Sequence, residues 1–466
     1  MVKKSSVDMR GNSIFVVPAL DSFLLFAPLH GITALLNESA VDLLKRGLQN
    51  GKDSPAHGEL TSLIEQLRTP ATRNPDRTGG LDPQFLGIIP SRRCNMSCIY
   101  CDFGEDYGRE QTIDPDRMIA AIDYYAELTW NSNRRVLSIQ FFGGEPFAEP
   151  EIIDIAVHHT RFVASKIGLI PHFEVLTNGC FSERQRRFVR DYFDRVVVSF
   201  DGFQKYHDRM RPMNSHQGSY DQVAETIRYL SDSSVDLAIR CCITSDSVNE
   251  MEAMAQWFCT EFQPDKVNFE TLTPNSRSAA AGLFPPDPYE FAGACIRSWR
   301  ILRDHMIEPV YAPVSLDTVQ TTSCPVGRDV LIVHPDGTVA SCYLHASDWA
   351  SKNLDLSVGH VSPQGHVEID FEKMKHLRNL VYNKPRCANC FCRFSCAGNC
   401  HVNCTYPGSS AKYIDFCTHT RIITVCCLLE NLGLRGRVDE LLADPPSLQA
   451  LSLHASDTLF HFKEEK

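Results

Sequence analysis

The chain has 466 residues, of which 43% are hydrophobic and 22% charged, enough for two or three domains with substantial cores. Its net charge of -11 argues against a general nucleic-acid-binding protein. No apolar run approaches membrane-spanning length, and Lys3-Lys4 is not followed by an uninterrupted apolar stretch, so we expect no transmembrane helix and no secretory signal. The 19 cysteines indicate thiolate metal ligands in a reducing cytoplasm rather than a disulfide scaffold.

Residues 1–75 are predicted to form a small unit of strands and helices. Two short strands are expected at 13–17 and 23–27, followed by an amphipathic helix capped by Asn37 and a second helix over 59–68. This order resembles the small winged-helix domain that binds leader peptides in peptide-maturation systems. A decoration that packs on the main domain is the alternative. Residues 69–83 are rich in Pro, Gly, Asp and Thr and are expected to be a linker.

From Phe85 to about residue 310, a strand followed by a helix is predicted six times. The strands are expected to begin at positions 85, 136, 172, 195, 237 and 266, and the helices to span 116–130, 151–167, 183–194, 220–231, 249–262 and 288–305. Asp114 followed by Pro115 is typical of a helix start. Six such units predict an α/β fold with a parallel sheet and right-handed crossovers.

A three-cysteine loop, Cys94-Asn95-Met96-Ser97-Cys98-Ile99-Tyr100-Cys101, follows the first of these strands. Three thiolates at this spacing can hold a metal centre with one position left open. A zinc knuckle or three incidental thiols are the alternatives.

The CxxxCxxC spacing with Tyr100 before the third cysteine resembles the signature of the radical S-adenosylmethionine (SAM) enzymes. The resemblance implies a 4Fe–4S cluster held by Cys94, Cys98 and Cys101, with SAM on the fourth iron and reductive cleavage to a 5′-deoxyadenosyl radical. It also implies that residues 84–310 form a partial, TIM-like (β/α)6 barrel, whose chemistry lies at the carboxyl ends of the strands.

Further motifs follow the next strands. Gly143-Gly144-Glu145-Pro146 resembles the family's GGEP motif, whose backbone contacts the SAM amino group, and its two glycines allow a close approach of the backbone. Thr177-Asn178-Gly179 and Ser199-Phe200-Asp201-Gly202 resemble family stretches at matching barrel positions. The resemblance makes Tyr100, Asn178, Ser199 and Arg211 further candidates for SAM binding, with Ser199 and Arg211 on the methionine carboxylate. Ordinary turns and surface charge are the alternative.

The third region, residues 320–430, is rich in cysteine, with the spacing C-x12-G-x4-C, a gap, C-x2-C-x5-C-x3-C, a gap, then C. Zinc is the alternative to iron for its CxxC pair. The pattern resembles the SPASM domain, an auxiliary iron–sulfur domain of radical SAM enzymes that modify peptides and proteins. The resemblance implies two auxiliary 4Fe–4S clusters, one on Cys324, Cys342 and Cys400 and one on Cys387, Cys390, Cys396 and Cys417, which makes three clusters in the chain.

The resemblance leaves the fourth ligand of the first auxiliary cluster open. Cys392, Cys404 and Asp329 are near in sequence, although an open iron that could bind a substrate thiolate is favoured. The remaining cysteines, mostly expected in the core, are Cys180, Cys241, Cys242, Cys259, Cys295, Cys426 and Cys427. A helix is predicted over 422–432, and residues 431–466 are expected to be a surface extension.

These observations predict a cytoplasmic radical SAM maturase that forms a thioether or carbon–carbon crosslink in a ribosomally made precursor peptide. Its expected partners are that peptide and a reducing protein such as flavodoxin or ferredoxin, with no nucleic acid and no membrane. The runner-up is an anaerobic sulfatase-maturase-like dehydrogenase that makes formylglycine. A non-catalytic iron–sulfur electron carrier is the alternative of another class. The sequence names neither the peptide nor the residue and bond modified.

Overall fold

The computed structural model describes residues 13–49, 58–74, 80–101, 103, 111–403 and 412–453. These residues form two compact units that do not follow chain order. The barrel unit contains the described residues of 80–311 and 324–378, and the terminal unit contains those of 13–74, 312–323 and 379–453. The predicted cysteine-rich domain is thus divided between the two units. No helix among the described residues has the length and apolar character needed to cross a bilayer.

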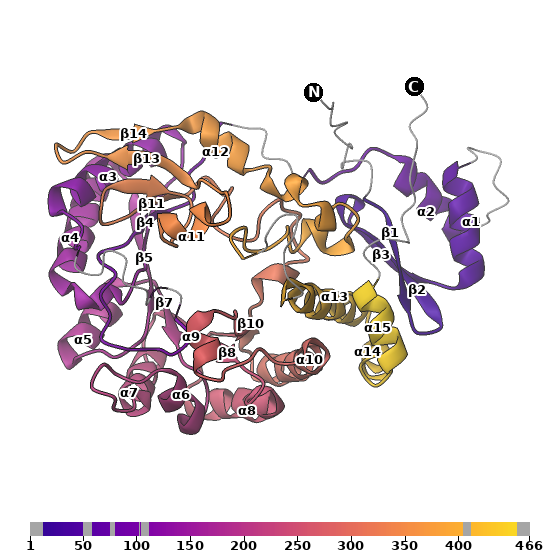
Figure 1. Ribbon diagram of the computed structural model, residues 1–466. Helices are drawn as coiled ribbons and strands as arrows, with labels where there is room; N and C mark the ends of the chain where they lie inside the picture. Colours follow the sequence, from indigo (N-terminus) through magenta and orange to yellow (C-terminus); the bar gives the residue numbers. More distant parts are fainter. Residues whose placement is uncertain are drawn as a thin grey trace. The chain divides into compact units, whose positions relative to one another are not determined.

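Six parallel strands in chain order form the centre of the barrel unit, as predicted (Figure 1). They are β4 (Leu86–Ile88), β5 (Val136–Phe141), β6 (Ile170–Thr177), β7 (Arg195–Ser199), β8 (Asp236–Ile243) and β9 (Lys266–Thr271). The connecting helices α3 (Pro115–Asn131), α4 (Pro150–Ile167), α5 (Glu183–Tyr192), α7 (Tyr220–Ser231), α8 (Met251–Glu261) and α10 (Pro288–Asp304) lie outside the arc of strands. This arrangement confirms the partial (β/α)6 barrel.

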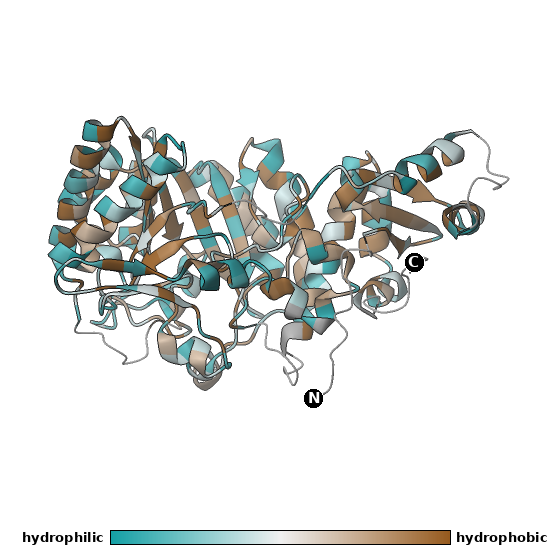
Figure 2. Ribbon diagram, turned by 90° about the horizontal axis from the view of Figure 1, so that it is seen from above, coloured by the Kyte–Doolittle hydropathy of each residue, from teal (hydrophilic) through white to brown (hydrophobic). Residues whose placement is uncertain are grey.

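Local sequence explains why these elements form. The Asp114 side chain caps α3 by accepting hydrogen bonds from the backbone N–H groups of Asp116 and Arg117, and Pro115 occupies the first helical position. Alternate residues of β7, Val196 and Val198, are fully buried. Figure 2 shows apolar strands beside helices in which polar and apolar residues alternate. The core therefore lies between the sheet and its helices.

The sheet continues beyond the predicted barrel at both ends. A short strand, β10 (Glu308–Pro309), pairs with β9, and β11 (Leu331–Val333) pairs in parallel with β4. Antiparallel strands β12 (Thr338–Ala340), β13 (Ser357–Val361) and β14 (Val367–Ile369) complete an 11-stranded sheet. Additional helices of this unit are η4 (Pro146–Ala148), α6 (Gln204–Met210), η5 (Val248–Glu250), α9 (Ser276–Ala280), α11 (Ala346–Ala350) and α12 (Phe371–Leu377).

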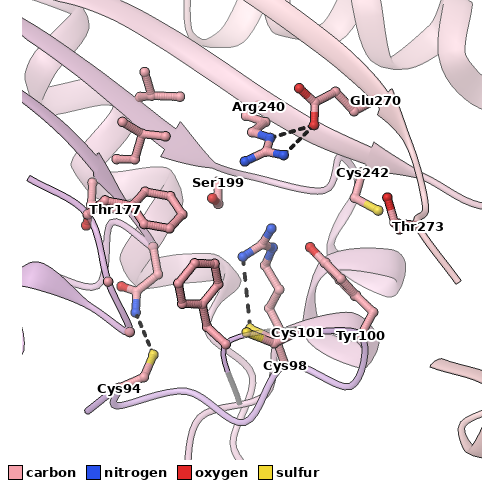
Figure 3. A pocket seen from close by; sticks show the side chains of 18 of the residues that line it. Cys94, Cys98, Tyr100, Cys101, Thr177, Ser199, Arg240, Cys242, Glu270 and Thr273 are labelled. Atoms are coloured by element: carbon pink, nitrogen blue, oxygen red, sulfur yellow. Dashed lines mark hydrogen bonds and ion pairs between the residues drawn. The ribbon is translucent and has the colours of Figure 1, made fainter. Parts of the chain in front are cut away.

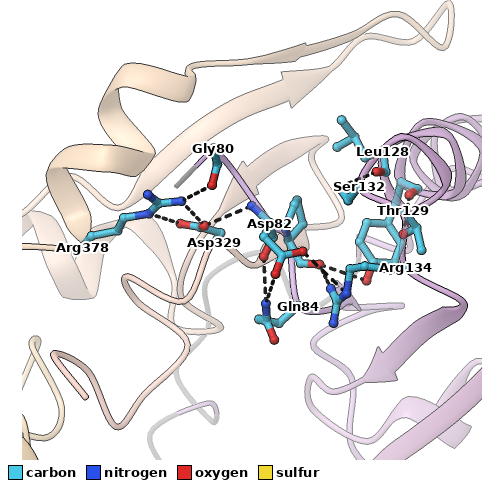
Figure 4. A network of polar contacts seen from close by, with 11 residues as sticks. Gly80, Asp82, Gln84, Leu128, Thr129, Ser132, Arg134, Asp329 and Arg378 are labelled. Carbon is cyan, nitrogen blue, oxygen red and sulfur yellow. Dashed lines mark hydrogen bonds and ion pairs between the residues drawn. The ribbon is translucent and has the colours of Figure 1, made fainter. Parts of the chain in front are cut away.

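A buried ion pair holds the start of the barrel to the added strands (Figure 4). Asp329 is 2% exposed and pairs with Arg378, whose Nη2 also donates to the Gly80 carbonyl at 2.9 Å. The Asp82 backbone N–H donates to Asp329 at 3.2 Å, and the Asp82 side chain pairs with Arg134 after α3. Residues 80–83, expected to belong to a linker, are therefore fixed to the barrel unit.

The terminal unit contains a three-stranded antiparallel sheet of β1 (Phe15–Ala19), β2 (Ser22–Ala27) and β3 (Ile32–Leu36), with η2 (Pro28–His30) between the last two. Helices α1 (Glu38–Gln49) and α2 (Glu59–Arg68) follow as predicted, and Asn37 caps α1 by accepting from the Ala40 N–H at 2.8 Å. Apolar residues of β1, β2, α1 and α2 form one core cluster. The third strand was not predicted.

The C-terminal part of this unit is helical rather than a surface extension. It comprises α13 (Lys412–Asn431), α14 (Arg435–Leu442) and α15 (Pro445–Leu453), preceded by η6 (Ala312–Val314), η7 (Leu380–Asn383), η8 (Pro385–Cys387) and η9 (Phe391–Phe394). Leu441 and Leu451 are fully buried, and α15 contacts β1 and α13. The expectation of an extension over 431–466 is therefore wrong for residues 431–453, because helically spaced apolar residues bury themselves there.

Candidate active site

A pocket of about 240 Å³ opens at the carboxyl ends of the barrel strands (Figure 3). Cys94, Cys98 and Cys101 lie on one side of it, and residues from the strand ends lie opposite. The lining also includes Tyr100, Phe103, Phe142, Gly143, Gly144, Leu176, Thr177, Asn178, Val197, Ser199, Arg211, Arg240, Cys242, Glu270, Thr271 and Thr273. The structure thus brings together the three cysteines and most of the predicted SAM-binding residues.

The cysteine loop is held in place by the segment after α6. The Ser97 N–H donates to the Pro212 carbonyl at 2.8 Å, and the Ile99 N–H donates to the Met210 carbonyl at 3.0 Å. In the opposite direction, Asn214 donates from its backbone to the Asn95 carbonyl and from its side chain to the Cys94 carbonyl. These hydrogen bonds fix the loop backbone, so the directions of the thiols depend on residues more than one hundred positions away.

Gly143 and Gly144 lie against the backbone that leads into the cysteine loop. Gly143 has a φ of 152°, and a Cβ there would lie 2.6 Å from the Ser91 carbonyl oxygen. A Cβ on Gly144 would lie 2.2 Å from the Arg93 carbonyl oxygen, while its N–H donates to the Ser91 carbonyl. Glycine is required at both positions because the turn lies directly against the backbone of residues 91–93.

Glu145 lies behind the pocket wall rather than in it. Its carboxylate accepts from the Thr177 hydroxyl at 2.8 Å, the Asn178 N–H at 2.7 Å and the Phe147 N–H at 3.1 Å. Burial raises the pKa of Glu145 to about 7, against the effect of these donors. Pro146 is also buried outside the pocket lining. Glu145 therefore joins the end of β6 to the glycine turn and acts on the pocket by positioning its wall.

Asn178 connects the end of β6 to the cysteine loop. Its Nδ2 donates to Asn95 Oδ1 at 2.7 Å and lies 3.6 Å from Cys94 Sγ. Its Oδ1 accepts from the Cys180 N–H at 2.9 Å. The side-chain amide is thereby oriented with its donors toward the loop, where they stabilise negative charge on the Cys94 sulfur.

Asp201 organises the other side of the loop. Its carboxylate is fully buried and accepts from Arg211 Nε and from the Tyr100 hydroxyl, both at 2.7 Å. Arg211 lines the pocket, lies over the Tyr100 ring and directs Nη1 to Cys98 Sγ at 3.9 Å. Sequence analysis quoted Asp201 only within its motif. Its place directly after a strand was the signal that it reaches the site.

An ion pair between Arg240 and Glu270 faces the pocket from the ends of β8 and β9 (Figure 3). Arg240 Nε donates to Glu270 Oε2 at 2.8 Å, and Asn268 Nδ2 donates to Glu270 Oε1 at 2.7 Å. Ser199 on β7 is the register partner of Arg240 and also lines the pocket. This pair was not predicted from the sequence, although both residues fall on predicted strands.

A second cysteine cavity lies within the terminal unit and has a volume of about 20 Å³. It is lined by Cys387, Cys390, Cys396 and Cys417, the four cysteines predicted to share one auxiliary cluster. Arg386, Cys392, Arg393, Gly398, Thr420 and Arg421 complete the lining. The hydrogen bond from Cys392 and the nearby Arg421 guanidinium lower the pKa of the Cys390 thiol, although its burial opposes them.

The sequence of this chain matches two known families over the regions just described. Residues 88–258 match the radical SAM superfamily, and residues 324–391 match SPASM, an iron–sulfur cluster-binding domain. The chain belongs to the radical SAM superfamily and carries a SPASM domain.

Known radical SAM proteins resemble this chain at low identity. The radical SAM cyclopropyl synthase TigE of Paramaledivibacter caminithermalis is 23% identical over 361 residues, which is 72% of each chain. A cysteine-type anaerobic sulfatase-maturating enzyme of Clostridium novyi is 20% identical over 70% of this chain and 90% of its own. Among solved structures, anSMEcpe with bound AdoMet and the Cp18Cys peptide has a TM-score of 0.60 at 18% identity, covering 76% of this chain and 99% of that chain. The structural likeness supports the radical SAM fold.

The residues of both sites fit iron–sulfur clusters. Burial raises the pKa of the Cys94 thiol to about 12 and that of Cys98 to about 11, so a cationic centre is needed to hold them as thiolates. No three His, Cys, Asp or Glu side chains in the described part of the chain surround a single ion position. A cubane cluster does not require this, because each thiolate binds a different iron. Donors from Asn178 and Arg211 already point at two of the sulfurs.

Two candidates for the open position of the first auxiliary cluster have other roles. Asp329 is committed to its buried ion pair with Arg378. Cys392 lines the second cysteine cavity, where its thiol lies 3.4 Å from Thr424 Oγ1. Cys404 lies outside the described residues. Of the three cysteines predicted to hold this cluster, Cys324 and Cys342 belong to the barrel unit and Cys400 to the terminal unit.

Most of the remaining cysteines are core residues, as predicted: Cys241, Cys259, Cys295, Cys426 and Cys427 are buried. Two differ. Cys242 lines the pocket, and Cys180 lies 3.7 Å from the Met213 sulfur beside the segment that holds the cysteine loop. Both follow from their positions near the ends of β8 and β6.

Proposed function

We propose that this radical SAM enzyme is a maturase that forms a thioether or carbon–carbon crosslink in a ribosomally synthesised precursor peptide. The observation that supports it best is the presence, in one chain, of a barrel pocket beside a three-thiol loop and of a separate four-thiol cavity in a SPASM domain. Relatives named for peptide chemistry support it further: AlbA of Bacillus subtilis, a biosynthesis protein of the bacteriocin subtilosin, is 25% identical over 204 residues.

Three cysteines would hold the radical cluster: Cys94, Cys98 and Cys101. When bound there, the cluster and SAM supply a 5′-deoxyadenosyl radical that abstracts a hydrogen atom from the substrate. The chain's own residues position these groups. Asn178 and Arg211 donate to two of the thiolates, and the Gly143-Gly144 turn and the Ser199 hydroxyl contribute pocket surface for the SAM amino and carboxylate groups.

Arg211 remains a candidate for the methionine carboxylate, with its Nε held by Asp201. Because the Asp201 carboxylate fixes one edge of the guanidinium, Arg211 enters the pocket in a single orientation. Across the pocket, the Arg240–Glu270 pair offers both charged donors and acceptors at the strand ends. We assign this polar wall to the peptide backbone of the substrate, which presents the complementary N–H and C=O groups.

Three clusters are proposed in all. Cys324, Cys342 and Cys400 would hold the first auxiliary cluster, and Cys387, Cys390, Cys396 and Cys417 the second. A reducing protein such as flavodoxin or ferredoxin would supply one electron to the radical cluster. In the terminal unit, β1 and β3 are the outer strands, and α15 contacts β1. A leader peptide is therefore proposed to add to the edge of β3 by strand pairing.

The test uses the reduced, iron-reconstituted enzyme with SAM and the short peptide encoded nearest to its gene. We expect 5′-deoxyadenosine release and a product that has lost two hydrogen atoms, with the crosslink located by tandem mass spectrometry. A sulfatase-derived cysteine peptide serves as the comparison substrate. Conversion of its cysteine to formylglycine, with the precursor left unchanged, would establish the sulfatase-maturase alternative. If neither peptide gave 5′-deoxyadenosine, the non-catalytic electron carrier would be the remaining alternative.

A further inference from the structure

The second cysteine cavity is surrounded by positive charge. Arg386, Arg393 and Arg421 line it beside the thiols, and no acidic side chain is among the described residues that do so. Arg393 and Arg421 are 1% and 4% exposed. Removing a guanidinium from water costs several kcal/mol unless a negative group compensates it. The charge of the lining therefore favours an anion in the cavity.

The contacts of Arg421 show which way its charge is directed. Nη1 donates to the Ser452 carbonyl at 2.6 Å, which anchors the side chain to α15. Its guanidinium is hydrogen-bonded to the Cys390 thiol, and within the described ranges its buried Nε has no acceptor. Arg421 lines the cavity, so this donor is available to a group bound there. The anchored side chain is thus built to serve a partner inside it.

Thr420 supplies a second hydrogen-bond donor to the cavity, independent of Arg421. It is 1% exposed, lines the cavity and has a buried hydroxyl without a partner in the described part of the chain. Thr424, one turn further along α13, shows the contrast. Its hydroxyl donates to the Thr420 carbonyl at 2.7 Å, which is the ordinary helical arrangement for threonine. Thr420 departs from that arrangement at the position that borders the cysteines.

We propose that Arg421 and Thr420 are positioning residues that donate hydrogen bonds to the sulfurs of the cluster held by Cys387, Cys390, Cys396 and Cys417, and thereby raise its reduction potential. The proposal rests on the proposed assignment of these four cysteines. This cluster would then have a higher reduction potential than the cluster at the barrel pocket.

The direction of the effect follows from electrostatics. One-electron reduction adds one negative charge to the cluster and its four thiolates, and burial penalises the more highly charged state. Sulfur-directed N–H and O–H donors and nearby guanidinium groups favour that state. A buried cluster without them would have a low potential, so the donors compensate for burial and keep the cluster reducible.

The experiment is a potentiometric titration with dithionite, followed by electron paramagnetic resonance. It uses the full chain with Cys94, Cys98 and Cys101 replaced by Ala, so that the radical cluster does not contribute. Arg421→Met removes charge and donors at similar volume, and Thr420→Val removes one donor at constant shape. We expect both to lower the midpoint potential of one cluster, Arg421→Met by more. Thr226→Val is the matched control, because it removes an equally buried threonine hydroxyl from helix α7 of the barrel unit, and it should leave the potential unchanged.

Iron content distinguishes a failure of the cluster assignment from a failure of the donor role. If further replacement of Cys387, Cys390, Cys396 and Cys417 by Ala removes no iron, the cluster assignment fails. If the cluster is present and Thr420→Val leaves its potential equal to that of the Thr226→Val control, the donor role is overturned. Thr420→Val decides the question even if Arg421→Met does not fold, because Arg421 anchors α15 through Ser452, whereas the Thr420 hydroxyl has no hydrogen bond to lose among the described residues.

Discussion

The two cysteine sites differ most in how their arginines are compensated. In the barrel pocket, Arg211 pairs with Asp201 and Arg240 pairs with Glu270. In the cavity of the terminal unit, the lining arginines have no acidic neighbour in the lining. Because cluster potentials depend on local charge and hydrogen bonds, carboxylates beside each arginine favour a low potential, and a lining with arginines but no carboxylate favours a higher one. Under the proposed assignment, the barrel site is built to donate an electron and the terminal site to accept one.

Removing the thiols of one site gives the largest expected effect. Replacing Cys94, Cys98 and Cys101 together with Ala should abolish SAM cleavage while iron is retained in the terminal unit, because the other clusters have their own cysteines. The measurements are 5′-deoxyadenosine by liquid chromatography and iron per chain. Substantial 5′-deoxyadenosine from the reduced triple variant would show that the radical site lies elsewhere.

Deleting residues 1–78 should weaken the four-thiol cavity of the terminal unit. These residues supply β1, against which α15 packs, and α13 of the same helical layer carries Cys417 and Arg421. We expect the deletion to weaken precursor binding and to lower iron retention at the four-thiol cavity, while uncoupled SAM cleavage persists. Arg437→Ala is the milder control, since it removes the contacts to Ala19, Asp21 and Ser22 at the β1–β2 turn and an ion pair with Glu440 but leaves the strands in place. Full iron retention in the deletion variant would contradict the packing argument.

Asp201→Ala should destabilise the barrel unit by about 3–5 kcal/mol, because it leaves the Arg211 guanidinium buried without its carboxylate. Asp246→Ala breaks the Arg209–Asp246 pair on the same segment, whose side chains are 48% and 44% exposed, and should cost less than about 1 kcal/mol. Urea denaturation of the two variants measures the difference. Equal midpoints would show that Asp201 does not compensate Arg211.

The smallest predicted effect is a pH dependence from His207 behind Asp201. Its Nδ1 accepts from the Asp201 N–H and its Nε2 contacts Ser219, and burial lowers its pKa to about 4. Neutral His207 contributes stability that is fully present above pH 6.5, its ordinary pKa, and is lost as pH falls toward 4, by about 2 kcal/mol at pH 5. Thermal unfolding between pH 5 and 7 should therefore be less pH-dependent in His207→Gln than in the exposed control His158→Gln. Equal slopes would rule out this role.

The barrel could be read from the sequence because each strand and helix carries its own local signal. Predicted strand starts such as Val136, Arg195 and Lys266 coincide with the observed ones. The strands β11–β14 could not be predicted, because three- to five-residue strands show little periodicity and the pairing of β11 with β4 is non-local. For the same reason, the sequence identified the cysteines of each site, Glu145 and Arg211, but not the Arg240–Glu270 pair of the barrel pocket or Thr420 and Arg421 of the terminal unit.

The attachment of the cysteine loop also determines when the enzyme can be loaded. Cys94, Cys98 and Cys101 are synthesised early, but the loop's backbone hydrogen bonds go to Met210, Pro212 and Asn214. A growing chain must complete strands β4 to β7 and helix α6 before those acceptors and donors exist. Until then the three thiols are an unsupported chain segment exposed to oxidation. Under the proposed assignment, we therefore expect iron delivery to this loop to follow folding of the barrel rather than to nucleate it.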